Sequence, residues 1–266
     1  MKLLLFDLDG TLLRRNKTIS ARTLQALARC RERGILIGIA TSRSEANCQP
    51  FLPLLQPDVF ISSSGTLVTC RGKTVASLEF SPEQAIGLIQ TARAICGDET
   101  EITVDTQSGY YWNYKVDPNE ADSSWGDTIW TDYRDFRKHA LKICVDIPDE
   151  TAASALAAEF PDYNCIRFSG TNWYQYTKSG ATKEQGARIL SEAAAIPMEE
   201  ITAFGDDLTD IGMLQACGTG IAMGNAAEAV KSAADLVIGT NEEDGIARWL
   251  EDYLDAGTRK LHSHSG

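Results

Sequence analysis

The chain has 266 residues, 43% of them hydrophobic, which suits one large domain or two smaller ones. Acidic residues outnumber basic residues by 37 to 25, and such a surface repels nucleic-acid phosphates and anionic lipids, so we expect neither as a partner. No apolar stretch approaches a membrane helix or a secretory signal, and the seven cysteines are scattered without a C-x-x-C pair, so we expect a cytoplasmic protein with reduced thiols.

The first part of the chain alternates buried strands with helices. The predicted elements are strands at 2–8, 35–41 and 58–65, helices at 20–33 and from 44 onward, and a hairpin over 66–80. Continuous apolar strands separated by helices predict a parallel sheet that is covered on both faces.

From Ser81 the order of elements changes. The predicted elements are helices at 81–96 and 149–160, strands at 101–106, 110–116, 141–147, 164–169 and 172–177, and an irregular aromatic stretch at 117–136. This order predicts a separate α+β unit with an antiparallel sheet.

At Thr182 the alternation of helix and strand returns. The predicted elements are helices at 184–195, 208–217, 226–234 and 245–254 and strands at 201–207, 219–225 and 235–239. We expect the polar tail 260–266, which carries His262 and His264, to be disordered. The simplest organisation is an α/β domain from residues 1–81 and 179–266, with residues 82–178 inserted as the α+β domain.

Polar residues follow the apolar strands at the points where those strands end. They are Asp7, Asp9, Thr41, Ser42, Ser64, Asp206, Asp207 and Asp210. In a doubly wound sheet the ligand site lies beyond the carboxyl ends of the strands, so these side chains should share one rim. Carboxylates held together need a cation, and an oxygen-only set without His or Cys favours Mg²⁺. A calcium loop starting at Asp7 would need Glu where Thr18 stands.

Two basic residues lie in the same segments. Lys183 begins a helix, where a cation opposes the helix dipole, so an anion such as phosphate is expected beside it; a solvated surface lysine is the alternative. Arg43 has the same two interpretations, as an anion anchor or as one half of a structural ion pair.

Taken together, the motifs resemble the haloacid dehalogenase superfamily, and specifically the Cof-type phosphatases with a class IIB (C2B) cap. They are Asp7-Leu-Asp9-Gly-Thr11, Thr41 in ATSR, Lys183 in ATKEQG, Gly205-Asp206-Asp207-x-x-Asp210 and Gly224-Asn225. The resemblance covers nearly the whole chain. It implies a doubly wound, Rossmann-like parallel-sheet core with an inserted α+β cap domain.

The resemblance also implies roles for individual residues. Asp7 would be the nucleophile and Asp9 the general acid and base. Thr41, Lys183 and the backbone amides of Leu8 and Ser42 would hold the phosphoryl group, with Asn225 facing the site. Mg²⁺ would be bound by Asp7, the backbone carbonyl of Asp9 and Asp206, with Asp210 supporting the metal site.

The implied activity is Mg²⁺-dependent hydrolysis of small phosphate esters through an aspartyl-phosphate, which fits the charge neutralisation that phosphoryl transfer needs. Sugar phosphates, pyridoxal phosphate or FMN are the expected kinds of substrate. A phosphomutase of the same fold and a non-catalytic regulator that binds a phosphorylated metabolite are the alternatives. A P-loop or dinucleotide fold lacks its fingerprint, and the sequence gives no indication of the oligomeric state.

Three positions depart from the family pattern: Ser42 where glycine is usual, and Ser64 and Thr209 where asparagine is common. In the inserted domain, alternation at 110–114 predicts that most aromatic side chains fill the domain's own core. Trp125 and Trp130, in the irregular stretch, are the expected ligand contacts.

Overall fold

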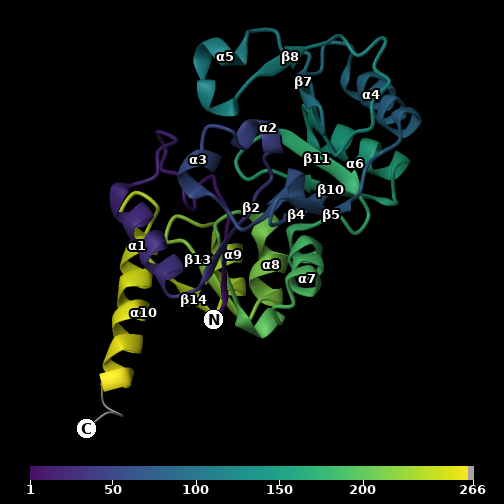
Figure 1. Ribbon diagram of the computed structural model, residues 1–266. Coiled ribbons are helices and arrows are strands. Elements are labelled where there is room, and N and C mark those ends of the chain that lie inside the picture. Colours follow the sequence, from purple (N-terminus) through teal and green to yellow (C-terminus); the bar gives the residue numbers. More distant parts are fainter. Residues whose placement is uncertain (263–266) are drawn as a thin grey trace.

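The computed structural model describes residues 1–262, without the side chains of Ala121, Trp125 and residues 257–262. Two sheets organise it, and Figure 1 shows the smaller one, with its helices, above the larger one. The larger sheet has eight strands. In spatial order they are β14 (Leu236–Val237), β13 (Thr219–Ala222), β12 (Ile201–Gly205), β1 (Leu3–Phe6), β2 (Leu36–Ala40), β3 (Val59–Ser62), β4 (Leu67–Cys70) and β5 (Lys73–Ser77).

The strands from β14 through β3 run parallel, and the hairpin of β4 and β5 extends the sheet antiparallel. The chain begins at β1 in the middle, adds β2 and β3 on one side and β12 and β13 on the other. A switch in strand order therefore lies between β1 and β12, where a doubly wound sheet places its ligand site. The predicted α/β doubly wound core is confirmed.

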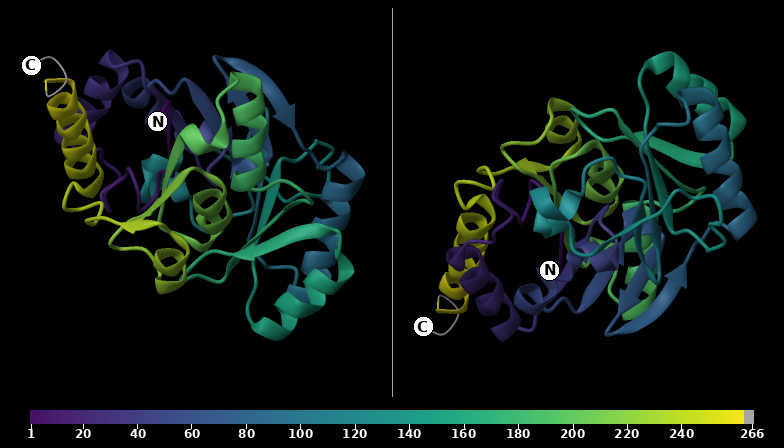
Figure 2. Two further views of the ribbon diagram at one scale, coloured as in Figure 1. Left: turned by 90° about the horizontal axis from the view of Figure 1, so that it is seen from below. Right: turned by 90° about the horizontal axis from the view of Figure 1, so that it is seen from above.

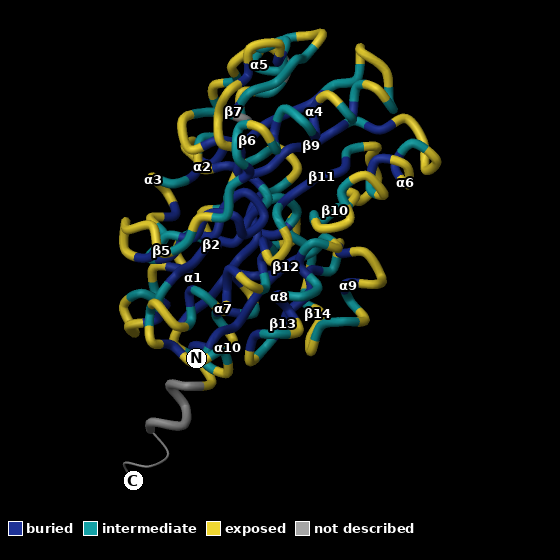
Figure 3. Tube along the Cα trace, turned by 90° about the vertical axis from the view of Figure 1, so that its right-hand side faces the viewer, coloured by how far each residue is buried: buried dark blue, intermediate teal, exposed yellow. Residues whose placement is uncertain are grey.

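Alternate side chains of β1 explain why both faces of this sheet are covered. Leu4 and Phe6 pack in one core with α1 (Ala21–Glu32) and α10 (Gly245–His262). Leu3 and Leu5 pack in the opposite core with α7 (Lys183–Ala194) and α8 (Ile211–Ala216). Figure 2 shows these helices on the two sides of the sheet, and Figure 3 shows the buried strands between them.

The shorter helices of the core domain occupy its loops. They are α2 (Glu45–Cys48), α3 (Leu52–Leu55) and α9 (Glu228–Ala233). Ser20, Ser44 and Thr182 cap α1, α2 and α7 by accepting backbone N–H bonds, so these helices begin where the sequence predicts. No helix of the described chain is long and apolar enough to cross a membrane.

The smaller sheet has six strands. In spatial order they are β10 (Tyr163–Arg167), β11 (Trp173–Lys178), β9 (Lys142–Asp146), β6 (Ile102–Thr106), β7 (Gly109–Trp112) and β8 (Thr128–Trp130). One face packs against α4 (Pro82–Cys96) and α6 (Glu150–Glu159), through side chains such as Val104, Ile143 and Tyr176. The opposite face looks toward the carboxyl ends of the larger sheet, and we call the smaller sheet with its helices the cap.

Two expectations about the secondary structure were wrong in part. The cap sheet is not wholly antiparallel, because the segment after β7, with α5 (Pro118–Ala121), brings β8 back alongside β7 in the same direction. The last helix, α10, does not end at Leu254 but runs through residues 260–262, because no proline stops it. Residues 263–266, with His264, and the side chain of His262 lie outside the described residues.

Candidate active site

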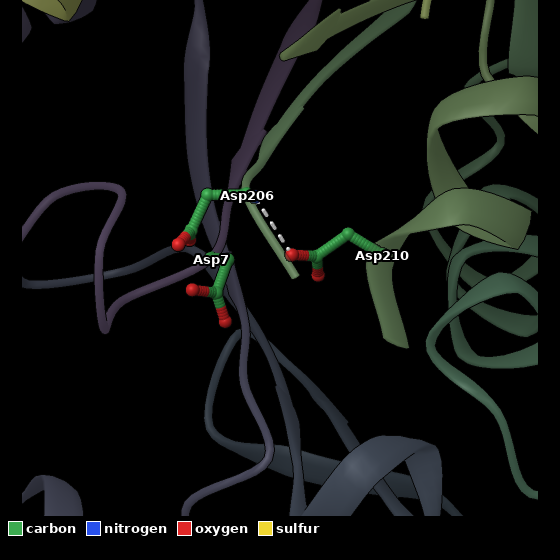
Figure 4. A group of neighbouring side chains, drawn as sticks. All are labelled: Asp7, Asp206 and Asp210. Atoms are coloured by element: carbon green, nitrogen blue, oxygen red, sulfur yellow. Dashed lines mark hydrogen bonds between the residues drawn. The ribbon is translucent and has the colours of Figure 1, made fainter. Parts of the chain in front are cut away.

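Three carboxylates meet at the switch in strand order. Asp7 follows β1 and Asp206 follows the neighbouring strand β12, whose registers align Phe6 with Phe204. Asp210 comes from the short 3-10 turn Leu208–Asp210 that leads into α8. One carboxylate oxygen of each residue lies within 4.8 Å of the others, and Figure 4 shows the three side chains converging.

Lys183 neutralises part of this charge. As the first residue of α7 it is 3% exposed, and its Nζ donates to Asp7 Oδ1 at 2.7 Å and to Asp210 Oδ1 at 2.6 Å. Burial alone would lower the pKa of Lys183, but the two carboxylates outweigh it and raise that pKa. Lys183 is therefore a buried cation beside the predicted nucleophile and not a solvated surface lysine.

Asp210 supports the neighbouring acidic residues. It is fully buried, and while Oδ1 accepts from Lys183, Oδ2 accepts the backbone N–H groups of Asp206 and Asp207, each at 3.0 Å. Both oxygens thus have protein partners, and Asp210 fixes the loop that carries Asp206. This position agrees with the supporting role that the family resemblance implies.

Asp206 is oriented by Thr11, whose hydroxyl donates to Asp206 Oδ1 at 2.7 Å. A side-chain carbon at Gly10 would lie 2.1 Å from Asp206 Oδ2, and Gly10 has a φ of +79°, so only glycine fits there. Burial and the neighbouring Asp210 raise the pKa of Asp206 to about 7. Burial also raises the pKa of Asp7, and Lys183 only partly opposes it.

Asp9 lies in a different electrostatic environment. Arg43 donates to it twice, from Nε at 2.6 Å and from Nη2 at 3.0 Å, and Lys17 Nζ donates at 2.7 Å. Burial alone would raise the pKa of Asp9, but Arg43 and Lys17 outweigh burial and lower it. The two aspartates of the first motif therefore have pKa values displaced in opposite directions, as acid–base sites often do.

Arg43 also joins the core domain to the cap. Its Nη1 donates to the carbonyl of Ser124 in the cap at 2.6 Å and to the carbonyl of Asn47 at 3.2 Å, while its guanidinium lies over the ring of Phe51. Of the two interpretations open from the sequence, the structure favours the ion pair, with Asp9 as the partner. The residue that orients Asp9 is therefore also bound to the cap.

The predicted phosphate-binding residues divide into two groups. Thr41 and Ser42 line the cavity described below, and Ser42 Oγ is buried with no hydrogen-bond partner among the described residues. The side chain of Leu8 is buried in the core, and its backbone carbonyl accepts a hydrogen bond from the N–H of Leu13.

Asn225 is not among the residues that line the cavity. Its amide nitrogen donates to the carbonyl of Gly10, and its amide oxygen accepts from the N–H of Asn241. Asn225 thereby supports the loop after β1, next to Asp206, and its role in binding phosphate stays a prediction.

The other two departures from the family pattern, Ser64 and Thr209, lie at the cap contact and at the cavity. Ser64, with a φ of 64°, bonds through its hydroxyl to Gln175 of the cap, and Thr209 lines the cavity.

Sequence reasoning did not identify Lys142 and Asp105 as interface residues. Lys142 pairs with Asp105 at 3.1 Å and bonds to the carbonyl of Ser42, while Ser63 donates to Asp105. The available signal was a charged residue at a buried position in each of two mostly buried strands.

A cavity of about 540 Å³ lies between the acidic cluster and the cap. The core side of its wall includes Asp7, Asp9, Thr41, Ser42, Arg43 and Lys183, and the cap side includes Thr103, Tyr110, Trp112, Lys142, Cys144, Phe168, Ser169, Thr171 and Trp173. Trp130 is 57% exposed and is not part of this lining, so its expected role as a ligand contact is wrong. The side chain of Trp125 lies outside the described residues.

Comparison with known proteins identifies the family. The sequence model of the haloacid dehalogenase-like hydrolases matches residues 4–250. The chain belongs to this family. The family predicted from the motifs is thereby confirmed, and so is the enzyme class, because the similar proteins are named phosphatases.

Similar proteins extend over nearly the whole chain. Pyridoxal phosphate phosphatase YbhA of Escherichia coli K12 is 29% identical over 95% of this chain and 98% of its own length. The 5-amino-6-(5-phospho-D-ribitylamino)uracil phosphatase YitU of Bacillus subtilis is 30% identical over 95% and 97%. The solved structure of the subclass IIB sugar phosphatase BT4131 shares the fold, with a TM-score of 0.82 at 24% identity over 95% of this chain and 99% of that one.

Proposed function

We propose that the chain is a Mg²⁺-dependent phosphatase that hydrolyses small phosphorylated metabolites through an aspartyl-phosphate on Asp7. The observation that carries the proposal is the buried contact of Lys183 with Asp7, beside Asp206, at the wall of a cavity of metabolite size. The names of the similar proteins, which include a pyridoxal phosphate phosphatase, support the same reaction class.

The acidic cluster fits a magnesium ion. Asp7 and Asp206 offer carboxylate oxygens, the ligands that Mg²⁺ prefers, and no His or Cys belongs to the cluster among the described residues. The raised pKa of Asp206 indicates that, without a cation, the site favours a bound proton in its place. Asp7, Asp206 and the backbone carbonyl of Asp9 would hold the ion, which would supply charge neutralisation for the transferring phosphoryl oxygens.

The residues suit a two-step transfer. A carboxylate oxygen of Asp7 attacks phosphorus, and the bond from phosphorus to the ester oxygen breaks as the leaving alcohol takes a proton from Asp9. Water then attacks the phosphorus of the aspartyl-phosphate, Asp9 accepts a proton from that water, and the bond from phosphorus to the Asp7 oxygen breaks, which releases inorganic phosphate and restores the carboxylate. Lys183 stays protonated throughout and stabilises negative charge beside Asp7.

Asp9 is prepared for the second step in the arrangement described here. Since Arg43 and Lys17 lower the pKa of Asp9, it is ionised and ready to accept a proton. Donating a proton in the first step requires that Asp9 loosen its contacts with Arg43. Because Arg43 is bound to Ser124, movement of the cap would change these contacts.

The phosphoryl group would be held by Thr41, Ser42 and nearby backbone amides such as that of Leu8. Ser42 Oγ, buried and without a partner in the described part of the chain, offers a hydrogen bond that the family's usual glycine cannot make.

The direct test is phosphate release from acetyl phosphate, 4-nitrophenyl phosphate, sugar phosphates, pyridoxal phosphate and FMN, with Mg²⁺ or with EDTA. We expect Mg²⁺-dependent release that is abolished in Asp7→Asn and retained in the control Asp255→Asn, a surface carboxylate on α10. Isomerisation of a sugar phosphate without net phosphate release, or release that persists in Asp7→Asn, would contradict the proposal.

A further inference from the structure

The cap side of the cavity carries a row of aromatic rings from strands that are not neighbours. Tyr110 and Trp112 come from β7, and Trp173 comes from β11. The ring centroids of Tyr110 and Trp112 are 6.3 Å apart, and those of Trp112 and Trp173 are 5.7 Å apart with an interplanar angle of 88°. All three rings line the cavity, together with that of Phe168.

The sheet order shows how the two indoles meet. Strands β6 and β9 separate β7 from β11, so their backbones lie about 14 Å apart at the usual strand spacing. Trp112 and Trp173 must therefore reach toward each other across the face of the sheet. The residues level with Trp112 on the intervening strands are the small Thr103 and Cys144, which face the same cavity. Both indoles remain half-buried, so ring surface is open to a ligand.

Four polar side chains of the same wall already have partners within the protein. Trp112 Nε1 donates to Glu101, Lys142 pairs with Asp105 and donates to the carbonyl of Ser42, Ser169 donates to Asp207, and Thr171 donates to the carbonyl of Phe168. A ligand with many hydroxyl groups would have to compete with these bonds for the same groups, which is unfavourable. A flat ring needs only the exposed aromatic surface.

We propose that Trp112 and Trp173 make this enzyme selective for phosphate monoesters whose alcohol carries a planar aromatic ring, over sugar phosphates, a preference that rests on the proposed function. The phosphate would lie at Asp7 and Lys183, and the ring would lie against the indoles across the cavity. The alternating pattern of β7 allows this placement, because Tyr110 and Trp112 face the cavity while Tyr111 packs against Phe136 on the other face.

The test compares kcat/KM for pyridoxal 5′-phosphate with that for glucose 6-phosphate and ribose 5-phosphate. In the wild type we expect the aromatic ester to be preferred by at least about tenfold, as one lost stacking contact of about 1.4 kcal/mol corresponds to a tenfold change. Trp112→Leu and Trp173→Leu should each lower this ratio by about tenfold, and Trp112→Phe, which keeps a ring, by less. Trp130→Leu, exposed and outside the cavity, is the control and should leave the ratio unchanged.

Binding to the Asp7→Asn protein, measured by calorimetry, separates this preference from catalysis. Tight binding of pyridoxal 5′-phosphate that is weakened in Trp112→Leu, with no turnover by the wild type, would contradict the proposed function and leave the aromatic preference standing. Equal or better turnover and binding of the sugar phosphates, or ratios that do not change in either tryptophan variant, would overturn the aromatic preference while the phosphatase activity stands.

Discussion

The two sides of the cavity are built in contrasting ways. On the core side, the charged groups come from residues at or near strand ends, and they are paired with one another: Lys183 with Asp7 and Asp210, and Arg43 with Asp9. On the cap side, side chains from one face of the cap sheet and from the loop between β10 and β11 present mainly aromatic surface. The core side is thus organised for charge, and the cap side for shape and stacking.

This contrast separates the chemical reaction, on the core side, from the choice of substrate, on the cap side. A chemical site at strand ends is fixed by the backbone of a doubly wound sheet, whereas the opposite wall depends only on which side chains a cap sheet turns toward it. Changes on the core side should therefore impair every substrate and the stability of the fold. Changes on the cap side should alter the ranking of substrates.

The largest effect is expected from Lys183→Met. Removal of this cation leaves Asp7 and Asp210 buried without a counter-charge, which should lower the free energy of unfolding by about 3–5 kcal/mol and remove turnover of every substrate. Chemical denaturation and phosphate release measure the two effects. Lys231→Met is the matched control, because its exposed pair with Glu228 should contribute only about 0.5 kcal/mol. Equal stability of the two variants would contradict the pairing described here.

The second-largest effect is expected on the stabilisation of the fold by Mg²⁺, which should depend on pH. With its pKa raised to about 7, Asp206 in the metal-free native protein keeps a proton that the unfolded chain has lost, so metal-free stability should fall as the pH rises toward 7. Mg²⁺ binds the ionised carboxylate, so its stabilising effect should be small at about pH 5.5, where Asp206 keeps its proton. At about pH 8, with Mg²⁺ at a hundredfold its Kd, the ion should raise the free energy of unfolding by about 2.7 kcal/mol. Thermal melting with Mg²⁺ or EDTA measures this difference. The same stabilisation at both pH values would show that Asp206 does not bind the ion.

A smaller effect is expected from Arg43→Gln. Loss of the guanidinium removes the main group that lowers the pKa of Asp9, so this pKa should rise. Because the second step needs ionised Asp9, the acidic limb of the pH profile of kcat should move to higher pH. An unshifted limb, with lower activity at all pH values, would indicate that Arg43 acts only on the fold or the cap.

The smallest effect is expected at the contact between the domains. Ser64→Ala removes the hydroxyl that bonds to the buried Gln175, which should cost about 1 kcal/mol in the free energy of unfolding. Ser77→Ala, whose hydroxyl bonds to Glu79 at the surface, is the control and should stay within about 0.5 kcal/mol of the wild type. Indistinguishable stabilities would show that this contact does not stabilise cap docking.

The same contrast explains what the sequence could predict. Asp7 and Asp206 are distant in the chain, but each ends a buried strand, and the rule for doubly wound sheets was enough to place them together. The pairing of Lys183 was less accessible, because a lysine at a helix start has the same local pattern whether it is solvated or buried. The contact from Arg43 to Ser124 depends on how the cap docks, which no local pattern records.

The cap shows most clearly what could not be predicted from the sequence alone. Alternation at 110–114 separates Tyr110 and Trp112 from Tyr111, but both faces of the cap sheet are covered, so the period does not say which face meets the cavity. The sequence interpretation assigned most of these aromatic side chains to the cap core and expected Trp130 as a ligand contact, whereas Tyr110 and Trp112 line the cavity and Trp130 is exposed. The way the cap packs on the core domain decides which of these side chains line the cavity.

The most direct measurement traps the covalent intermediate. The enzyme with Mg²⁺ and pyridoxal 5′-phosphate would be quenched with acid within one turnover, and its peptides would be analysed by mass spectrometry. We predict a phosphoryl group on Asp7 of the wild type and none in Asp7→Asn. Phosphate release without any phosphorylated Asp7, or a phosphoryl group on another residue, would contradict the assignment of Asp7 as the nucleophile.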